Sequence, residues 1–488
     1  MSTRAFAGAT ALLLTTAPGA WAQLTADEVW SGWQEAYGNY GMALSATEER
    51  SGGTLTLNDL TQRMDLAGVV TEGTYGAIAL VEQPDGTVRI EIPEDMTVIS
   101  TTTFEGETIE QTFRITQQGF DAIVSEDGGA RIYTMIAQSF GYEFDDITSG
   151  EAPQPIPLTA TLTDFETTYT TRDNGDGLSL DQDFSAGGMT VNIEAIAADE
   201  PFRVTYTARD LTGTGDGTVG GPLDPTETAS LSDLGLDFDM TFGHGGSELA
   251  IEADTPDGPF TMSSTASGGE VFIGLTPDGL SEVFSSTGTE ATIQVPQFPL
   301  PMAISMDAFS AGFTLPIGVS EDTKPLALDL VLRDLIVDEA IWSLFDPTGQ
   351  LPRDPATLVL DLDGEAVMSA DILGDPEALA DGPPGELKSL TLGDLTLSFG
   401  GANLAASGDL DFPTPDVTQP VGAIDLAVDG AFALVDRFVA LGFLPAEQAA
   451  FAKGMAGAVA RPVGEDQLES TIEFTEGGGI SANGLPLR

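Results

Sequence analysis

The segment Leu358–Val367, "LVLDLDGEAV", decides which fold class we expect for this chain. Leucines alternate there with Val359, Asp361 and Asp363. A period of two places the leucines on one side of an extended strand and both carboxylates on the other. We therefore predict a β-strand with one apolar face and one face open to water.

The same residues suggest a second interpretation, because an apolar run ending in Asp-x-Asp-Gly also opens the site of haloacid-dehalogenase-type phosphatases. That chemistry needs a parallel sheet interleaved with helices, and the sequence that follows, "AVMSADILGD", carries no helix signal. Glu365 would also add a third negative charge where phosphate must enter. We interpret Asp361 and Asp363 as a solvated strand face and assign no catalytic residue.

Similar alternating runs recur along the chain, for example "GTVRIEI" (86–92), "LALDLVLRDLIV" (326–337) and "LTLGDLTLSF" (390–399). Pro-Asp-Gly turns follow extended segments at 84–86, 256–258 and 277–279. The expected fold class is mainly β, with one or more large curved antiparallel sheets and a few helices near the N- and C-termini.

The first helix is predicted close to the N-terminus. Thr25 and Glu28 form a capping box, and Trp30, Trp33 and Tyr37 follow on one helical face. An aromatic stripe at this spacing is more often a docking face than a ligand cage. In the partner-docking alternative, Trp30 and Trp33 are expected to be exposed.

Two further helices are expected near the C-terminus. Each has apolar residues on one face, at Leu434, Phe438 and Leu441 and at Phe451, Met455 and Val459. The segment 431–444 is the most apolar of the mature chain, but Asp436 and Arg437 interrupt it. We predict a core helix there and no transmembrane segment.

The N-terminus has the pattern of a secretory signal peptide. Arg4 precedes an apolar run, and Ala20-Trp21-Ala22 fits the A-x-A cleavage motif. We expect cleavage between Ala22 and Gln23 and an exported, periplasmic product.

Residues 1–22 are thus the signal peptide, and three units are expected after it: 23–154 with the N-terminal helix, 155–298, and 299–488 with the C-terminal helix pair. Pro-rich segments at 149–157 and 295–301 suggest these boundaries. "PIPLTATLTDFETTYT" (155–170) aligns without a gap with "PLPMAISMDAFSAGFT" (299–314). Duplication of a unit of roughly 150 residues and chance similarity between strands both account for this.

Composition excludes several functions. The chain has 17 Lys and Arg against 77 Asp and Glu, a formal net charge of −60, which argues against nucleic-acid binding. It has no cysteine and one histidine, His244, so thiolate chemistry and multi-histidine metal sites are impossible. His244 lies in a Gly-rich stretch, where we expect a solvated loop. We expect no cofactor.

The segment "RDNGDGLSLDQD" (172–183) raises the question of calcium. Asn174, Asp176 and Asp183 fall at ligand positions of an EF-type loop, but Arg172 occupies the first position, where a carboxylate is needed. A hairpin with an Asp-Gly turn explains the same residues, and we favour it. The Gly-rich segment 213–221 lacks the lysine of a phosphate-binding loop.

Three segments together resemble a bacterial family of uncharacterised exported proteins, domain-of-unknown-function family 2125. They are "ADEVWSGWQEAYGNYG" (26–41), "EAIWSLFDPTGQLPRDPATLVLDLDG" (339–364) and the strand-helix-helix-strand region from Ile424 to the closing "GGGISANGLPLR". The resemblance covers nearly the whole mature chain and brings no activity or site residues. In pattern, "GDLTLSFGGANLAASGDLDF" (393–412) is also similar to AsmA-type envelope proteins, whose curved sheets are associated with lipid movement.

We expect an exported envelope protein that binds an apolar ligand or lipid on a curved sheet without catalysis. A structural or partner-docking periplasmic protein is the alternative, and a hydrolase using carboxylates comes third. An open row of apolar side chains would favour ligand binding, whereas a filled sandwich core would favour the structural role.

Overall fold

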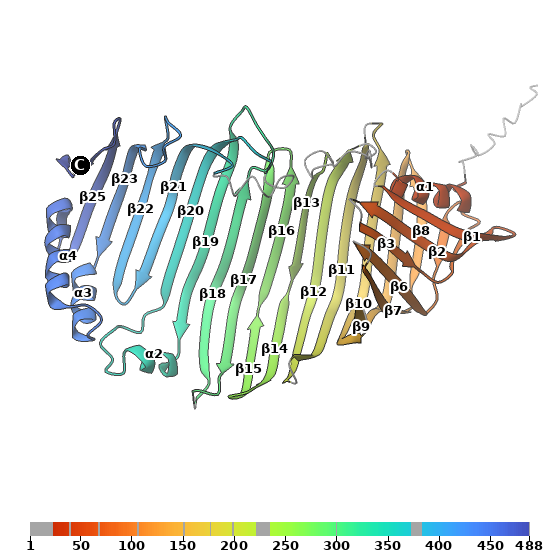
Figure 1. Cartoon of the computed structure of the whole chain (residues 1–488), viewed down its shortest axis with the longest axis horizontal. Helices are drawn as coiled ribbons and strands as arrows, with labels where there is room; N and C mark the ends of the chain where they lie inside the picture. The colour runs from red at the N-terminus through yellow and green to blue at the C-terminus, as the bar shows by residue number, and fades with distance from the viewer. Residues whose placement is uncertain are drawn as a thin grey trace, which may run out of the picture.

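The computed structural model describes residues 23–38, 41–66, 69–104, 107–149, 152–175, 177–197, 200–220, 235–298, 300–371 and 383–487. Its 27 strands form one sheet, in which every pairing is antiparallel (Figure 1). Four helices accompany the sheet in this part of the chain. The predicted mainly β fold with a large antiparallel sheet is confirmed.

The helices are α1 (Ala26–Gly38), α2 (Glu339–Phe345), α3 (Ala431–Ala440) and α4 (Ala446–Val459). The strands up to residue 149 are β1 (Met42–Ser51), β2 (Thr54–Leu66), β3 (Val69–Thr74), β4 (Ile78–Glu82), β5 (Val88–Glu91), β6 (Asp95–Phe104), β7 (Glu107–Gln118), β8 (Asp121–Asp127) and β9 (Ala130–Ser149). The central strands are β10 (Ala152–Asp173), β11 (Gly177–Ala197), β12 (Glu200–Gly220), β13 (Asp237–His244), β14 (Gly246–Thr255), β15 (Gly258–Ala266), β16 (Gly268–Thr276), β17 (Gly279–Gln294), β18 (Met302–Leu315) and β19 (Lys324–Val337). The remaining strands are β20 (Ala356–Met368), β21 (Gly385–Phe399), β22 (Ala402–Asp411), β23 (Val421–Asp429), β24 (Arg461–Gly464), β25 (Gln467–Thr475), β26 (Gly479–Ala482) and β27 (Leu485–Pro486).

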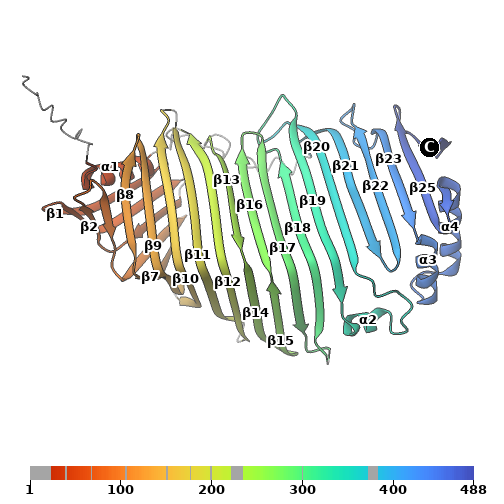
Figure 2. The same ribbon diagram turned by 180° about the vertical axis from the view of Figure 1, so that it is seen from behind.

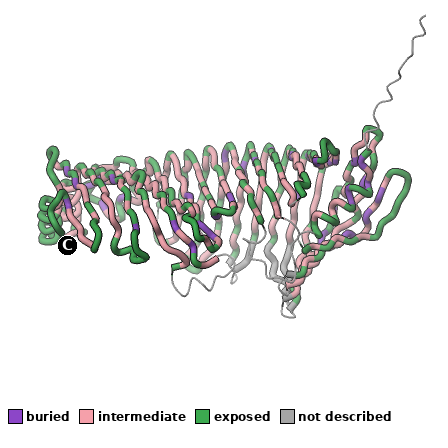
Figure 3. The backbone as a smooth tube through the Cα atoms, turned by 90° about the horizontal axis from the view of Figure 1, so that it is seen from above, coloured by how far each residue is buried: buried purple, intermediate pink, exposed green. Residues whose placement is uncertain are grey.

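The strands lie side by side along the molecule nearly in chain order (Figures 1 and 2). Short strands lie end to end where one long strand would otherwise run: β3 with β4 on β2, β7 with β8 on β9, and β13 with β14 on β12. The strands are bowed when the sheet is seen from above, and β1–β8 turn away from the line of the others (Figure 3). Helix α1 lies at one end of the sheet and α3 and α4 at the other (Figure 1).

The expected boundaries between units fall within this continuous sheet. The position 154/155 lies near the start of β10, which pairs with both β9 and β11, and 298/299 lies between β17 and β18, which pair with each other. The division into units, and the duplication, stay predictions. Phe165 and Phe309, which the alignment equates, each pack against a neighbouring ring, Phe184 and Phe284 respectively.

Four aspartates inside strands adopt a left-handed backbone conformation. Asp59, Asp164, Asp210 and Asp334 have φ between 50° and 53°. Each occurs in the same short pattern, an apolar residue, any residue, the aspartate and another apolar residue, as in Leu162–Phe165. Left-handed geometry is unfavourable for most residues and is tolerated best by glycine, asparagine and aspartate, which explains the residue type.

These positions belong to one line that crosses the sheet, here called the kink line: Asp59, Asp164, Gly187, Asp210, Gly245, Gly288 and Asp334. Thr163 and Arg209 are both opposite Gly188, so Asp164 and Asp210 flank Gly187 in the neighbouring strands. Gly245 separates β13 from β14 beside Asp210, and its amide donates to the carbonyl of Arg209 at 2.9 Å. The end-to-end strands therefore break where the long strands bend.

The kinks keep one face of the sheet apolar along the full length of the strands. Leu162 and Phe165 are three residues apart and would point to opposite sides of a regular strand. In the structure Phe140, which is opposite Leu162, has its ring centroid 6.5 Å from that of Phe165. The extra residue at Asp164 thus resets the alternation, as a β-bulge does.

Several local predictions are confirmed. The amide of Thr25 donates to Oε2 of Glu28 at 2.8 Å and the amide of Glu28 donates to Oγ1 of Thr25 at 3.2 Å, which is the capping box. β10 and β11 form the predicted hairpin, with Asp173 opposite Leu178. Helices α3 and α4 occur where two were expected, whereas α2 was not predicted.

The kink predicts unequal effects for two substitutions at Asp164, whose side chain is exposed. Asp164→Gly should preserve stability, because glycine adopts positive φ freely. Asp164→Val should lower the free energy of unfolding by about 1–2 kcal/mol, the cost of left-handed geometry for an ordinary residue. Chemical denaturation measures both.

The matched control is Asp181→Val, which replaces an exposed aspartate in β11 opposite Asp216. Valine suits a strand and the change relieves a like-charged pair, so this variant should be no less stable than the wild type. Equal stability of Asp164→Val and Asp181→Val would contradict a specific backbone role for Asp164.

Candidate functional site: an uncovered apolar face

The leucines of β20 belong to a row that crosses the sheet from β2 to β25. Residues directly opposite one another in antiparallel strands point to the same side of the sheet. Followed from strand to strand, the row is Leu55, Leu80, Ile90, Ala122, Met135, Thr167, Phe184, Gly213, Phe242, Val271, Phe284, Ala311, Leu330, Leu360, Leu395, Ala406, Leu426 and Ser470. We call the side of the sheet that carries this row the apolar face.

Two sequence features that looked like interruptions maintain this face. The run Gly213–Gly221 contributes glycines to β12, and a Cβ added at Gly213 would lie 3.1 Å from the ring of Phe242 and 3.2 Å from that of Phe184. The glycine therefore lets two neighbouring rings lie over the backbone. In β21, the bulge at Gly393–Asp394 keeps both Leu392 and Leu395 opposite leucines of β20.

The apolar face is covered at its N-terminal end by α1. Leu55, Leu57 and Leu80 are fully buried there beneath the helix. The expectation that Trp30 and Trp33 are exposed is wrong, because Trp30 is buried in this core and Trp33 packs against it. The aromatic stripe contacts the protein's own sheet, since the apolar face continues beneath α1.

Helix α2 and the loop after it lie near the other end of the face. Trp342 is buried and stacks on Phe399 of β21, with ring centroids 6.4 Å apart, and the guanidinium of Arg353 lies 4.3 Å from the centre of the Trp342 ring. Asp346, fully buried, accepts from the amides of Gln350 and Leu351, each at 2.8 Å, and from Nη1 of Arg353 at 2.7 Å.

The Asp346 carboxylate holds this loop in place. Burial by itself raises the pKa of Asp346, but the two amides and Arg353 outweigh burial and lower the pKa to about 2. The Asp346 side chain is therefore charged around neutral pH and is held by these three donors. Every described hydrogen bond of the Asp346 carboxylate lies within the segment 346–353, so we assign it a structural role.

Between these ends the apolar face is uncovered in the described part of the chain. All the strands belong to one sheet; α1 packs on β1, β2 and β4 at one end, α3 on β22 and α4 on β24 toward the other, and α2 packs on β18 at the lower edge of the sheet (Figure 1). Phe242, Phe284, Leu328 and Leu397 remain 47%, 45%, 46% and 41% exposed. The face that is a core under α1 thus becomes an open apolar surface in the middle of the molecule.

The opposite face is acidic around the segment that decided the fold class. Asp361 is opposite Asp329 in β19 and Asp394 in β21, and Asp363 is opposite Thr391. The prediction that Asp361 and Asp363 share a strand face is confirmed by these pairings. Partial burial, followed by the nearby charges of Asp361 and Asp363, raises the pKa of Asp329.

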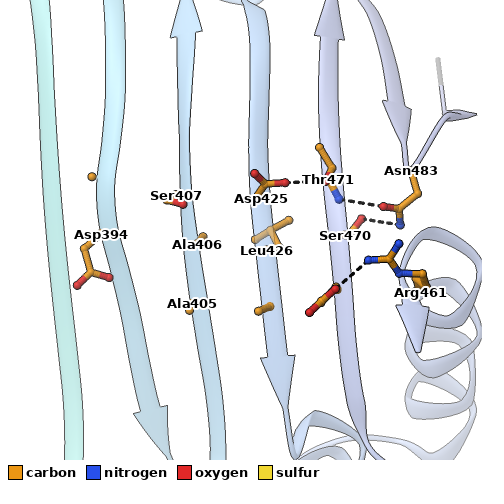
Figure 4. Close-up of a pocket in the computed structure, with 13 residues that line it drawn as sticks. Asp394, Ala405, Ala406, Ser407, Asp425, Leu426, Arg461, Ser470, Thr471 and Asn483 are labelled. Atoms are coloured by element: carbon orange, nitrogen blue, oxygen red, sulfur yellow. Dashed lines mark hydrogen bonds and ion pairs between the residues drawn. The ribbon is translucent and has the colours of Figure 1, made fainter. Parts of the chain in front are cut away.

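A shallow polar pocket of about 470 Å³ lies at the C-terminal end of the sheet (Figure 4). Its side chains bind one another: Oγ1 of Thr471 donates to Asp425 at 2.6 Å, the Thr471 amide donates to Asn483 at 3.1 Å, and Arg461 pairs with Glu469 at 2.9 Å (Figure 4). The pocket is lined by no histidine and no cysteine. These contacts tie β23, β25 and the turn after β26 together, which is a structural role.

The calcium candidates do not come together among the residues that are described. Asn174 lies in the turn between β10 and β11, where its amide donates to the Gly177 carbonyl at 2.9 Å. Asp183 lies six residues beyond Gly177 along β11, which is roughly 20 Å at strand spacing, and is opposite Thr168 and Thr214. Asp176 lies outside the described residues, and calcium binding stays the untested alternative to the hairpin.

His244 is not a solvated loop residue, contrary to expectation. It ends β13 opposite Gly269 and is half-buried, next to Gly245 on the kink line. Its Nδ1 is buried and has no hydrogen-bond partner among the described side chains and backbone. No described carboxylate orients the ring, so the geometry of a catalytic triad is not present there.

Comparison with known proteins gives one family. Residues 288–487 match a family described as "Uncharacterized protein conserved in bacteria (DUF2125)". The matched residues run from β17 to β27 and contain α2, α3 and α4 but not α1. No curated protein matches the chain. The similarity to AsmA-type proteins is one of pattern and stays a prediction.

The raised pKa of Asp329 predicts a pH-dependent effect of Asp329→Asn. A carboxyl group whose pKa is raised by folding favours the folded state when protonated, so its contribution to stability falls as pH rises above about 3.9. Asp329→Asn should therefore be more stable than the wild type at pH 7, by roughly 0.2–1 kcal/mol for a relieved like-charged pair.

Thermal unfolding measured from pH 3 to pH 8 checks this. The difference between variant and wild type should shrink toward zero below about pH 3.9, where Asp329 is protonated in both states. A difference that is constant across this range would show that charge is not its cause.

Proposed function

We propose that the apolar face binds the acyl chains of a lipid or a similar apolar ligand, in a chain whose residues 288–487 match a bacterial family of uncharacterized proteins. The observation that supports this most directly is the change in burial across the apolar face, from fully buried Leu55 under α1 to exposed Phe242, Phe284 and Leu397 where no described helix covers the face. Large exposed apolar patches are rare on proteins in water and usually mark binding surfaces.

The dimensions and chemistry of the face suit acyl chains. The row across the sheet has only two polar members, Thr167 and Ser470, and no charged one. A chain lying across neighbouring strands gains about 0.8 kcal/mol for each buried CH₂. The absence of charge on this row favours a hydrocarbon over a peptide, whose backbone groups would need hydrogen-bond partners.

Two other functions are weaker. A partner-docking role based on Trp30 and Trp33 loses its basis, since α1 uses them against its own sheet. Catalysis by carboxylates has no assigned residues, because the described aspartates of the acidic face lie open to water and the lone histidine has no orienting partner. A purely structural envelope protein remains the alternative, and it predicts a protein that carries no lipid.

We also propose that the protein acts in the periplasm after export. The pattern of residues 1–22 supports this, although Ala22 lies outside the described residues. Leu24, two residues after the proposed cleavage site, is buried and its amide donates to the Gly86 carbonyl at 3.2 Å, so the fold is engaged almost directly after Gln23. None of the described helices combines the length and apolar character needed to cross a bilayer.

Lipid binding predicts that protein isolated from its own envelope fraction without detergent carries lipid. Leu397→Glu should reduce the lipid recovered by about tenfold or more, since losing two CH₂ contacts is already about 1.6 kcal/mol. Native mass spectrometry and lipid extraction measure the amount.

Thr396→Glu is the control, because Thr396 adjoins Leu397 in β21 but is opposite Val359 on the other face. It adds the same charge to the same strand and should leave the lipid content unchanged. Wild-type protein that is lipid-free, and whose unfolding temperature does not rise on adding phospholipid, would favour the structural alternative.

Export predicts a mature protein that begins at Gln23. The small residues Ala20 and Ala22 meet the requirement of the signal peptidase. Intact mass measurement of the exported protein should give the chain without residues 1–22. A substitution of Ala22 by a bulky residue should cause the uncleaved form to accumulate, and exported protein that retains residues 1–22 would refute the assignment.

A further inference from the structure

Helices α3 and α4 are attached to the end of the sheet by polar contacts at their termini. The amides of Phe432 and Ala433, at the start of α3, donate to the Asp466 carboxylate, each at 2.9 Å. At the end of α4, the Val459 carbonyl accepts from Ser470 at 2.9 Å and from Asn483 at 3.0 Å. These contacts fix where the helix pair sits and leave its outer surface free of described neighbours.

That outer surface is apolar. Phe443, in the turn between the helices, is 56% exposed, and Phe451 and Met455 of α4 are 70% and 48% exposed. Phe451 and Met455 are four residues apart and therefore share one side of α4. The expectation of a core helix at 431–444 is not met, since α3 has no buried residue, and Ala449 is the one buried residue of α4.

Charge distinguishes the helix pair from the rest of the chain. Residues 431–459, which span both helices, contain two acidic residues, Asp436 and Glu447, and two basic ones, Arg437 and Lys453, against a formal net charge of −60 for the whole chain. Lys453 pairs with Asp436 at 2.6 Å and Arg461 with Glu469 at 2.9 Å. The segment is thus close to neutral in an otherwise strongly acidic protein.

We propose that the α3–α4 pair docks on the surface of a phospholipid bilayer, with Phe443, Phe451 and Met455 entering the boundary between head groups and acyl chains. Exposed aromatic and methionine side chains on a helix without net negative charge suit that boundary. The acidic remainder of the chain is repelled by anionic lipid, so end-on contact through this pair is the orientation that electrostatics favours.

The α3–α4 pair lies next to the apolar face, so docking through it would bear on the proposed function. Leu434 of α3 lies over Gly400, next to Phe399 on β21, and the last residue of α4 contacts Ser470 on the apolar face. A bilayer at this end would adjoin the apolar face. The docking itself rests only on the helix pair and does not require lipid to occupy that face.

Cosedimentation of the full mature chain with vesicles tests the proposal. We expect binding to phosphatidylcholine vesicles, and at least a tenfold weaker binding of the double variant Phe451→Ser with Met455→Ser. Both side chains are exposed, so the variant should unfold at the wild-type temperature. Val319→Ser, which removes a 67% exposed apolar side chain between β18 and β19, is the control and should bind like the wild type.

Salt gives a second readout. With vesicles that also contain phosphatidylglycerol, binding should strengthen as sodium chloride rises, because screening shortens the Debye length from about 10 Å at 0.1 M to about 3 Å at 1 M and relieves repulsion of the acidic chain. An attraction based on positive charge would weaken instead.

Three outcomes would overturn the proposal: no sedimentation with either kind of vesicle at any salt concentration, equal binding of the double variant, or self-association of the protein alone that the double variant abolishes. The last would make the patch an interface between two copies of this chain. Leu397→Glu separates the two proposals, because it should lose bound lipid and still sediment with vesicles.

Discussion

A left-handed backbone residue in the middle of long strands is the constraint on which the rest of this structure depends. Side chains alternate strictly along a regular strand, so apolar residues three positions apart would point to opposite faces, and half of a long strand's apolar residues would lie in water. Asp59, Asp164, Asp210 and Asp334 each supply a bend and one extra residue, which together return the apolar residues to one face along one line across the sheet. Curvature and a continuous apolar face therefore have the same cause.

One continuous apolar face on a single sheet leaves a surface that the chain covers only in part. A sandwich would bury it under a second sheet, but here the chain covers it with α1 at one end and with α2 and the C-terminal helices near the other. The side chains in the open middle still contact one another across strands, as Phe284 and Phe309 do with ring centroids 6.1 Å apart. Such lateral packing stabilises the sheet while it leaves the outer surfaces of the side chains free for a ligand.

Sequence predicted what depends on neighbouring residues and missed what depends on distant ones. The strand at Leu358–Val367, the capping box of Thr25 and Glu28 and the hairpin of β10 and β11 follow from alternation, local hydrogen bonding and turn residues, and all three occur. Trp30 is buried and not exposed for a partner, and α3, which was expected to be a core helix, has no buried residue. An apolar stripe on a helix indicates that its side chains prefer apolar contacts. Only the fold determines whether the sheet of the same chain is close enough to provide them. The kinks were missed because an apolar-x-Asp-apolar pattern looks like an ordinary polar interruption of a strand.

The acidic composition opposes the self-association that this architecture would otherwise favour. A long sheet with an open apolar face and free edge strands is prone to pair with further copies of itself. Like charges aligned on the opposite face, such as Asp329, Asp361 and Asp394 on adjacent strands, cost stability within one molecule, which is why the pKa of Asp329 is raised. The same charges repel a second sheet that approaches to stack or to extend the first. Because the repulsion acts between whole molecules and apolar contact acts locally, a neutral hydrocarbon can reach the apolar face where another acidic protein cannot. In the proposed function, selectivity for an uncharged apolar ligand would therefore follow from the distribution of charge around the face as much as from the leucines on it.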